Sequence, residues 1–229
     1  GEWLTIVGGN GSGKSTLVRL MNGLLQPTFG EVTIYGKKTS DRQQLKNIRQ
    51  QIGMVFQNTE NQVVGMTVWE DAAFGLYNTG ASPDHIQFKC CSILQRLNLY
   101  ERKDHPPYFL SGGEKQKLAI AGVLVMEPKV IVFDEAASML DMRSAQQLRE
   151  IMSKLHQNKM TIIQVTNDVE DIFLADRLIV MQHGWIRFDG TSQEAVDDSS
   201  IFTHSGLLPP FSTRMRDLGH THKLELVDP

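Results

Sequence analysis

A glycine-rich loop between a predicted strand and a predicted helix constrains this chain more than any other feature. Residues 8–16 read Gly-Gly-Asn-Gly-Ser-Gly-Lys-Ser-Thr, preceded by the apolar run 4–7 and followed by the amphipathic run 17–21. A glycine, four residues, Gly-Lys and Ser or Thr form the phosphate-loop pattern, which requires a strand before it and a helix after it. The sequence therefore predicts an α/β fold organised around an anion-binding loop.

The residue types of this loop predict how it binds a triphosphate. Its glycines let the backbone turn N–H groups inward, and the start of the following helix adds a partial positive charge. We expect Lys14 to reach the outer phosphates and the Ser15 hydroxyl to ligate Mg²⁺. The alternative, a turn without a ligand, does not require Lys-Ser after the last glycine. The predicted binding residues are Gly8, Gly9, Asn10, Gly11, Ser12, Gly13, Lys14, Ser15 and Thr16.

The composition limits the classes to which the chain can belong. It has 229 residues and a formal charge of −3, and this negative net charge does not attract a nucleic acid. The longest apolar run, residues 118–126, is far below the roughly 18 residues of a membrane span, so we expect no transmembrane segment. Cys90 and Cys91 are adjacent and cannot bridge each other without strain, which favours a reducing cytosol. Gly1 leads directly into the first strand without an initiator Met, so we expect a segment upstream.

Short apolar runs alternate with amphipathic runs, as in a parallel sheet covered by helices on both faces. The predicted strands are residues 4–7, 31–35, 52–56, 130–133, 160–165, 177–181 and 185–189, the last two joined by a hairpin turn. The predicted helices are residues 14–22, 41–51, 68–76, 84–97, 114–126, 143–156 and 169–174. Residues 58–128 show no strand pattern, which indicates a helical insert. We expect a domain over residues 1–190 and a peripheral tail over 191–229.

Two acids follow the predicted strand 130–133. At this place Asp134 is expected to hold the water shell of Mg²⁺, and Glu135 to polarise an attacking water as general base. The alternative is a strand that simply ends in surface acids. Together with the phosphate loop, the pair favours hydrolysis of a nucleotide.

The stretch Leu-Ser-Gly-Gly-Glu at residues 110–114 supports two compatible interpretations. Ser111 and Glu114 have the spacing of a capping box at a helix start. Gly112 and Gly113 also expose backbone N–H groups that can hold an anion, here the γ-phosphate of a nucleotide bound elsewhere.

With these motifs in order, the chain resembles the ATP-binding cassette ATPases, whose signature is Leu-Ser-Gly-Gly-Gln. The resemblance covers almost the whole chain and includes Gln57 after a strand and the loop 138–141, which crosses between subunits in that family. It implies a phosphate-loop NTPase core with a mainly parallel sheet and a helical subdomain, its N-terminal strands lying before Gly1. It also implies ATP and Mg²⁺ as ligands. Two cassettes would face each other head to tail, each ATP lying between one phosphate loop and the partner's residues 111–114.

The region after the predicted strand 52–56 narrows the resemblance to one group within the family. Residues 56–76 look like the cassettes of energy-coupling factor transporters, which import vitamins and metal ions. By that likeness Gln57 touches Mg²⁺ and the attacking water; without it, Gln57 is a surface residue. The implied partners are a second ATPase subunit, identical or different, a transmembrane coupling protein and a substrate-binding membrane protein. The implied location is peripheral, at the cytoplasmic face of the cell membrane. Nucleic acid is not among the expected partners.

The sequence departs from the family at three places. Asn167 replaces the usual His, and its amide donates a hydrogen bond but stays neutral, so the site on this phosphate loop is expected to be slow. A tolerated substitution is the alternative. Glu114 replaces the signature Gln, either as a cap or as a carboxylate near the partner's ATP. The adenine-stacking aromatic of the family would precede Gly1.

Two other functions stay open on these residues. One is a catalytically weak nucleotide-binding subunit of a heterodimeric complex, and the other is a soluble cassette ATPase without a role in transport. The aromatic residues Phe56, Trp69 and Phe74 are explained equally well as the lining of a groove for a helix of a membrane partner and as core residues of the insert. We predict that the acids beside them, Glu60, Glu70 and Asp71, receive basic residues of that helix.

Overall fold

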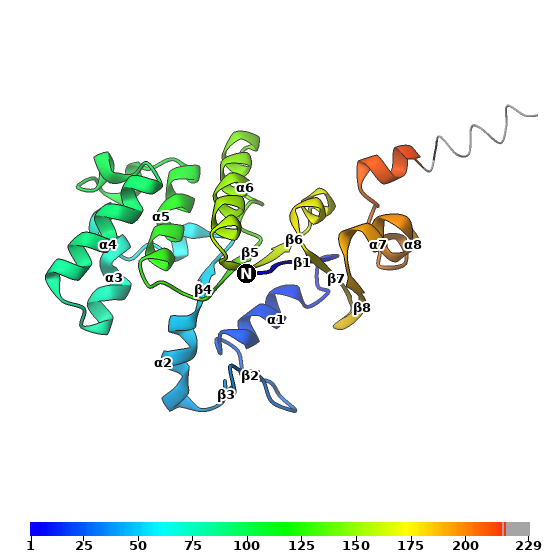
Figure 1. The fold of residues 1–229 in the computed structure, drawn as a ribbon, viewed down its shortest axis with the longest axis horizontal. Helices are drawn as coiled ribbons and strands as arrows, with labels where there is room; N and C mark the ends of the chain where they lie inside the picture. Colours follow the sequence, from blue (N-terminus) through cyan, green and yellow to red (C-terminus); the bar gives the residue numbers. More distant parts are fainter. Residues whose placement is uncertain (217, 219–229) are drawn as a thin grey trace, which may run out of the picture.

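The computed structural model describes residues 1–216 and 218 of the chain. In these residues the main sheet has six strands, of which only the last is antiparallel to its neighbour. In spatial order the strands are β4 (Ile52–Val55), β5 (Val130–Asp134), β6 (Thr161–Thr166), β1 (Trp3–Gly8), β7 (Arg177–Gln182) and β8 (Trp185–Gly190). The predicted α/β fold with a mainly parallel sheet is confirmed (Figure 1).

The register of the parallel strands brings their carboxyl ends to one edge. Val7 of β1 pairs with Thr166 of β6, and Asp134 of β5 pairs with Val165 of β6. Segments that follow these three strands therefore meet at that edge. This is where ligands bind in open α/β sheets.

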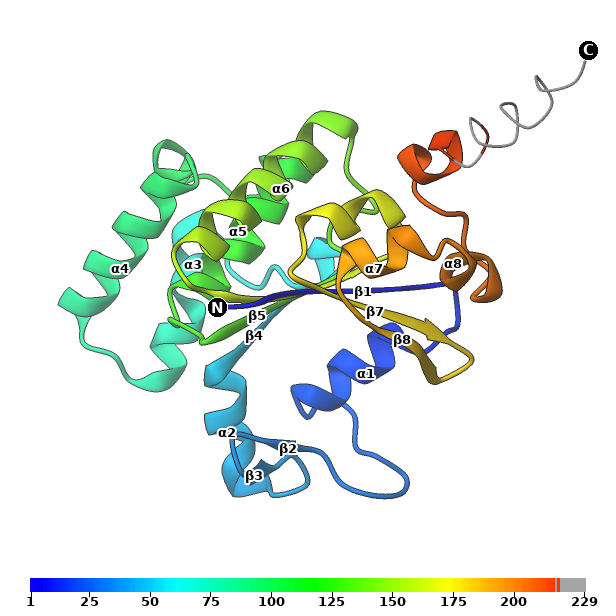
Figure 2. The same ribbon diagram turned by 45° about the vertical axis from the view of Figure 1, so that its right-hand side comes forward.

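Helices cover both faces of the sheet, as alternate side chains of its strands require. On one face Val18 of α1 (Lys14–Met21) packs with Val132 of β5. On the other, Met152 of α6 (Met142–Gln157) packs with Phe133. Figure 2 shows α1 on one side of the sheet and α6 on the other. The predicted end of α1 is confirmed, since Gly23 has a φ of 65°.

The helical insert lies at one end of the molecule (Figure 1). Its main elements are α3 (Val68–Thr79), α4 (Pro83–Arg96) and α5 (Gly112–Leu124), linked by the 3₁₀ turns η1 (Thr59–Asn61), η2 (Tyr100–Arg102) and η3 (Pro107–Phe109). A buried cluster joins α3, α4 and α5 to the sheet and to α6. The signature helix α5 is thus packed into the insert and also against the core.

Two predicted elements have a different form in the structure. The predicted strand 31–35 is shorter: β2 (Thr33–Ile34) pairs only with β3 (Lys37–Lys38), apart from the main sheet, before α2 (Arg42–Gln51). The predicted helix 169–174 is the 3₁₀ helix η4 (Val169–Leu174). It ends with a hydrogen bond of 3₁₀ type, in which Ala175 N–H donates to the carbonyl of Ile172, three residues earlier.

The segment after β8 packs on the end of the sheet opposite the insert (Figure 1). Ala195 of α7 (Ser192–Asp197) and Phe202 of α8 (Ser200–His204) are fully buried with Val7 and Val180. Burial of an aromatic side chain contributes about 2–3 kcal/mol, so this part of the predicted tail is fixed to the core. Residues 217 and 219–229 of that tail lie outside the described residues. Within residues 1–216 and 218, no helix has the length and apolar character of a membrane span.

Candidate nucleotide site

The phosphate loop follows β1 and is locked to the β7–β8 hairpin. Gly13 has a φ of 101°, a region that disfavours side chains. A Cβ on Gly8 would lie 2.4 Å from the Met181 carbonyl oxygen, and Gly184 N–H donates to the Ser12 carbonyl at 3.0 Å. Around Gly11 the space is open. A hollow of about 200 Å³ lies against residues 10–16 and Glu135, so the backbone of the loop is accessible to a phosphate chain.

Lys14 is held inside this loop. Its Nζ donates to the carbonyl oxygens of Gly8 at 2.8 Å and Gly9 at 3.1 Å, and lies 4.0 Å from Glu135 Oε1. Burial lowers the pKa of Lys14, against the opposing effect of Glu135 and Asp134. A partly desolvated ammonium binds an incoming anion more strongly than one in water. Lys14 therefore provides a cation at the base of the hollow.

Ser15 and Asp134 form the predicted Mg²⁺ pair. Ser15 Oγ, at the start of α1, donates to Asp134 Oδ1 at 2.7 Å, and Asp134, at the end of β5, is 2% exposed. A hydroxyl and a carboxylate are the hard oxygen ligands that Mg²⁺ prefers. Arg19 also donates to Asp134 Oδ2 at 3.3 Å. The donor set fits the ion. Arg19 was not predicted, although it stands one helical turn after Ser15 on the same face.

Glu135 and Asn167 face each other across the carboxyl edge of the sheet. Asn167 Nδ2 donates to Glu135 Oε1 at 3.1 Å and to Asn10 Oδ1 at 3.2 Å. Glu135 has a φ of 53°, rare for a residue with a side chain, and its N–H donates to the Val165 carbonyl at 2.9 Å. Three loops, after β1, β5 and β6, thus meet through one amide.

Gln57 stands after β4 and is exposed. The turn that carries it is held by a residue that sequence reasoning missed. Gln62 Nε2 donates to the Met54 carbonyl at 2.8 Å, and Gln62 Oε1 accepts from Phe56 N–H at 3.2 Å. Gln57 is thereby kept at the edge where β4 ends, but on the outer strand of the sheet.

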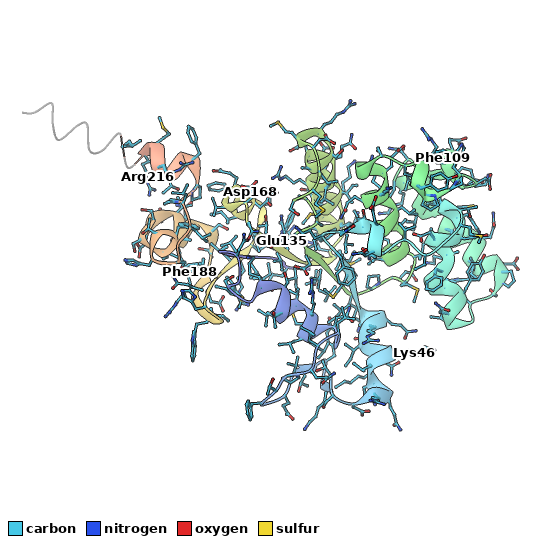
Figure 3. The ribbon with its side chains drawn as sticks, turned by 180° about the vertical axis from the view of Figure 1, so that it is seen from behind. Lys46, Phe109, Glu135, Asp168, Phe188 and Arg216 are labelled. Carbon is cyan, nitrogen blue, oxygen red and sulfur yellow. The ribbon has the colours of Figure 1, made fainter. Side chains whose placement is uncertain are left out.

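The signature loop, residues 110–114, has the predicted capping box. Ser111 Oγ accepts from Glu114 N–H at 3.3 Å, and Glu114 Oε2 accepts from Ser111 N–H at 2.9 Å. The backbone hydrogen bond from Ser111 is the main cause that lowers the pKa of Glu114. Phe109, just before this loop, lies toward the outer end of the insert, whereas Glu135 lies near the centre of the molecule (Figure 3). Gly112 and Gly113 of this loop lie against Leu140 and Ser144, and among the described residues no hydrogen bond or ion pair joins residues 110–114 to the phosphate loop.

Comparison with known proteins identifies the family that has this arrangement of motifs. A sequence profile described as ABC transporter matches residues 1–138. The chain belongs to the ABC transporter family. An energy-coupling factor transporter ATP-binding protein EcfA1 of Halalkalibacterium halodurans is 42% identical over 216 residues, 94% of this chain and 78% of that protein. The cobalt import ATP-binding protein CbiO of Syntrophus aciditrophicus is 40% identical over 232 residues, 100% of this chain and 83% of that protein.

Solved ABC cassettes have the same fold. The structure of cbiO1 from Clostridium perfringens, described as part of the ABC transporter complex cbiONQ, has a TM-score of 0.80 and 32% identity over 97% of this chain and 87% of its own. A dimeric cassette in a post-hydrolysis state, bound to ADP and Pi, has a TM-score of 0.74 and 30% identity over 83% of this chain and 85% of its own. The predicted resemblance to energy-coupling factor cassettes is confirmed.

The predicted docking acids have partners within the ABC cassette. Asp71 is 8% exposed, and its Oδ1 accepts from Val64 N–H at 2.6 Å and Gly65 N–H at 2.9 Å. Glu60 pairs with Lys115 at 2.7 Å, and Glu70 accepts from Met66 N–H at 3.0 Å. The prediction that Asp71 receives basic residues of a partner is wrong, because this carboxylate holds the turn before α3.

Proposed function

We propose that this chain is the ATP-binding and ATP-hydrolysing subunit that powers import of a micronutrient, a vitamin or a metal ion, by an energy-coupling factor type transporter. The observation that carries the proposal is the meeting of Lys14, Asp134 and Glu135 at the mouth of the phosphate loop. The names of the EcfA1 and CbiO relatives support the coupling to import.

Each residue of the site has a defined task in this proposal. Lys14 exchanges its carbonyl partners for phosphate oxygens, and Gly8 to Thr16 supply the backbone N–H groups. Ser15, Asp134 and Gln57 would hold Mg²⁺, which would neutralise charge on the phosphates. Glu135 accepts the proton of the attacking water. Asn167 fixes the direction of the Glu135 carboxylate through the 3.1 Å hydrogen bond.

A second subunit completes the site. Residues 111–114 lie in the helical insert, where Gly112 and Gly113 face Leu140 and Ser144 and not the phosphate loop of the same chain. We propose that they bind the γ-phosphate of ATP held by a partner cassette, identical or different. The dimeric structure of a similar cassette supports this arrangement. A transmembrane coupling protein and a substrate-binding membrane protein would place the dimer at the cytoplasmic face of the membrane.

One observation favours a second candidate, a catalytically weak subunit of a heterodimer. The Asn167 amide is neutral at every pH, whereas a His can add positive charge at the same place. Transition-state charge would then be less stabilised at this phosphate loop, and the faster site would belong to the other cassette. A soluble cassette ATPase is a third candidate, which purification distinguishes.

The test starts from the full-length protein, purified from its native membranes in mild detergent with its bound partners. Integral membrane proteins in the complex, ATP turnover, and ATP-dependent uptake of cobalt or a vitamin into vesicles are expected. Lys14→Ala should abolish turnover and uptake. Lys46→Ala removes an exposed lysine of α2, away from the loop, and serves as control (Figure 3). Recovery of the protein alone from the soluble fraction would contradict the transport role.

A further inference from the structure

An arginine of α6 reaches across to the turn that carries Asn167. Arg149 Nε donates to Asp171 Oδ1 at 2.7 Å, and its NH2 group donates to Asp168 Oδ2 at 3.0 Å. Both acids belong to the segment that follows β6, and Asp171 is 2% exposed. The single guanidinium therefore joins helix α6 to the β6–η4 turn through two charge-assisted hydrogen bonds.

Asp171 is the centre of a buried network that also fixes the end of β6. Its Oδ2 accepts from Gln164 Nε2 at 2.7 Å and from Thr166 Oγ1 at 3.0 Å. Gln164 in turn accepts from the Trp3 indole of β1 at 3.1 Å. Burial raises the pKa of Asp171, and the hydrogen bond from Arg149 acts against this rise. The carboxylate thus has partners on β6 and α6.

The contacts of this network lie on both sides of Asn167. Thr166, the preceding residue, donates to Asp171, and its Oγ1 accepts from Asp168 N–H at 3.0 Å. Asp168, the following residue, accepts from Arg149. With both neighbours held, the backbone at residue 167 has one direction, and its amide points to Glu135 and Asn10.

A hollow of the surface lies beside the Arg149 bridge. This hollow of about 500 Å³ is bounded by apolar residues of α6, by residues 164–168 and 171, and by Phe133 with residues 135–138 after β5. Arg149 lines this hollow, and its two hydrogen bonds join α6 to the turn beside it.

We propose that Arg149 and Asp171 are positioning residues for hydrolysis, which act by holding Asn167 in hydrogen-bonding distance of Glu135. The inference rests on the proposed ATPase function and adds to it a part outside the nucleotide-binding motifs. It predicts that the loss of Arg149 affects turnover through Asn167 and not through ATP binding.

A double-mutant cycle on the purified membrane complex tests this route. Arg149→Met should lower kcat about tenfold, because small displacements of catalytic geometry are costly, and leave KM within about twofold. In an Asn167→Ala background the same substitution should lower kcat less than about twofold, because the effects of two mutations do not add when one residue acts through the other. Equal losses in both backgrounds, or a loss confined to KM, would overturn the proposal.

Matched variants separate positioning from folding. Arg177→Met removes a similar two-bond pair to Asp189, at 2.6 and 2.7 Å, on β7, and should leave kcat unchanged. Asp168→Asn removes the charge next to Asn167, keeps an acceptor for the N–H of Glu170, and should lower kcat in the same way as Arg149→Met but less. A thermal unfolding curve for each variant shows whether the fold is intact.

Hydrogen exchange gives a readout that does not depend on turnover. Arg149→Met should speed amide exchange in residues 164–172, and Arg177→Met should not. Unchanged exchange there would overturn the positioning role even if the complex were inactive. A wild-type complex that binds ATP without turnover, yet shows the exchange effect, would contradict the ATPase function and leave the positioning of Asn167 supported.

Discussion

Around the phosphate loop, hydrogen bonds join residues from loops that follow different strands of the sheet. In the signature loop, the hydrogen bonds of Ser111 and Glu114 stay within one helix start. On the first side Ser15 meets Asp134, and Asn167 meets both Glu135 and Asn10. On the second side a capping box satisfies the helix start locally. The hydrogen bonds of the first half-site join loops after three strands, whereas those of the second lie within the first turn of one helix.

This difference teaches how the two half-sites respond to change. Groups already held by neighbours need little reorganisation when charge develops, which is the basis of electrostatic catalysis. The cap is made within the first turn of α5, so the signature loop can be presented to another subunit intact. Substitutions on the first side should therefore impair hydrolysis at the phosphate loop of their own chain, and those on the second should change turnover only in an assembled dimer.

The strongest test of the phosphate-loop side is Glu135→Gln. Removal of a general base costs about 10²–10⁴-fold in rate, while the amide retains the size and most hydrogen bonds of the side chain. Turnover by the complex should fall by that range, with ATP still bound. Single-turnover kinetics and fluorescent-nucleotide titration measure the two quantities. Glu150→Gln, an exposed residue of α6, is the control. A loss of less than tenfold would show that Glu135 is not the base.

The signature side is tested by Gly112→Ala, which the chain itself accommodates. The nearest atom to an added Cβ is Leu140 Cδ2 at 4.0 Å, so the helix forms as before. Crowding of the N–H groups should lower turnover of the assembled dimer about tenfold, less than loss of a full oxyanion donor. The melting temperature of the separate subunit should not fall. Gly113→Ala is less clean, since its Cβ would lie 2.6 Å from Ser144 Oγ. Unchanged turnover would break the comparison.

Much of the site was predictable because its residues belong to short motifs, whose members lie close together in the sequence. The phosphate loop, the acid pair and the capping box each occupy a few consecutive positions, and their strand and helix contexts follow from local patterns. Glu135 and Asn167 were placed in one site only by resemblance to a family. The pairing of β5 with β6 brings them together in the structure.

Other parts depend on packing that spacing does not encode. Arg149 and Asp171 stand 22 residues apart on separate elements, and only the fold makes them partners. In the six residues of η4, apolar positions three apart fit a 3₁₀ turn as well as an α-helix. Asp71 looked like a surface acid because its backbone partners, Val64 and Gly65, lie in an irregular turn.

Asn167→His refines the comparison within the phosphate-loop side. A His beside the Glu135 carboxylate is favoured in its charged form, and a charged donor makes roughly twice as strong a hydrogen bond as a neutral one. Turnover at this phosphate loop should rise a few-fold, with an additional pH dependence from the imidazole that is absent from the Asn chain. The measurement is the pH profile of kcat for both chains in the same complex. No gain at any pH would show that the amide already suffices.

Glu114→Gln gives the smallest expected effect, and it decides which task the carboxylate has. Its pKa is lowered in the folded chain, so it stabilises the fold above its unfolded pKa, and this contribution is lost as pH falls through the folded value. Gln can still accept from Ser111 N–H but carries no charge. The variant should lose under about 1 kcal/mol at pH 7, and the difference from the parent chain should vanish in acid.

Turnover separates the cap from a role at the partner's ATP. If Glu114 only caps α5, Glu114→Gln leaves kcat and KM of the dimer unchanged while the free energy of unfolding shows the acid-dependent difference. Ser111→Gly removes the other half of the cap and serves for comparison, since its Oγ accepts from Glu114 N–H at 3.3 Å. A change in KM without a change in stability would place the carboxylate beside the nucleotide of the other subunit, and the signature half would then take part in binding through its charge as well as its backbone.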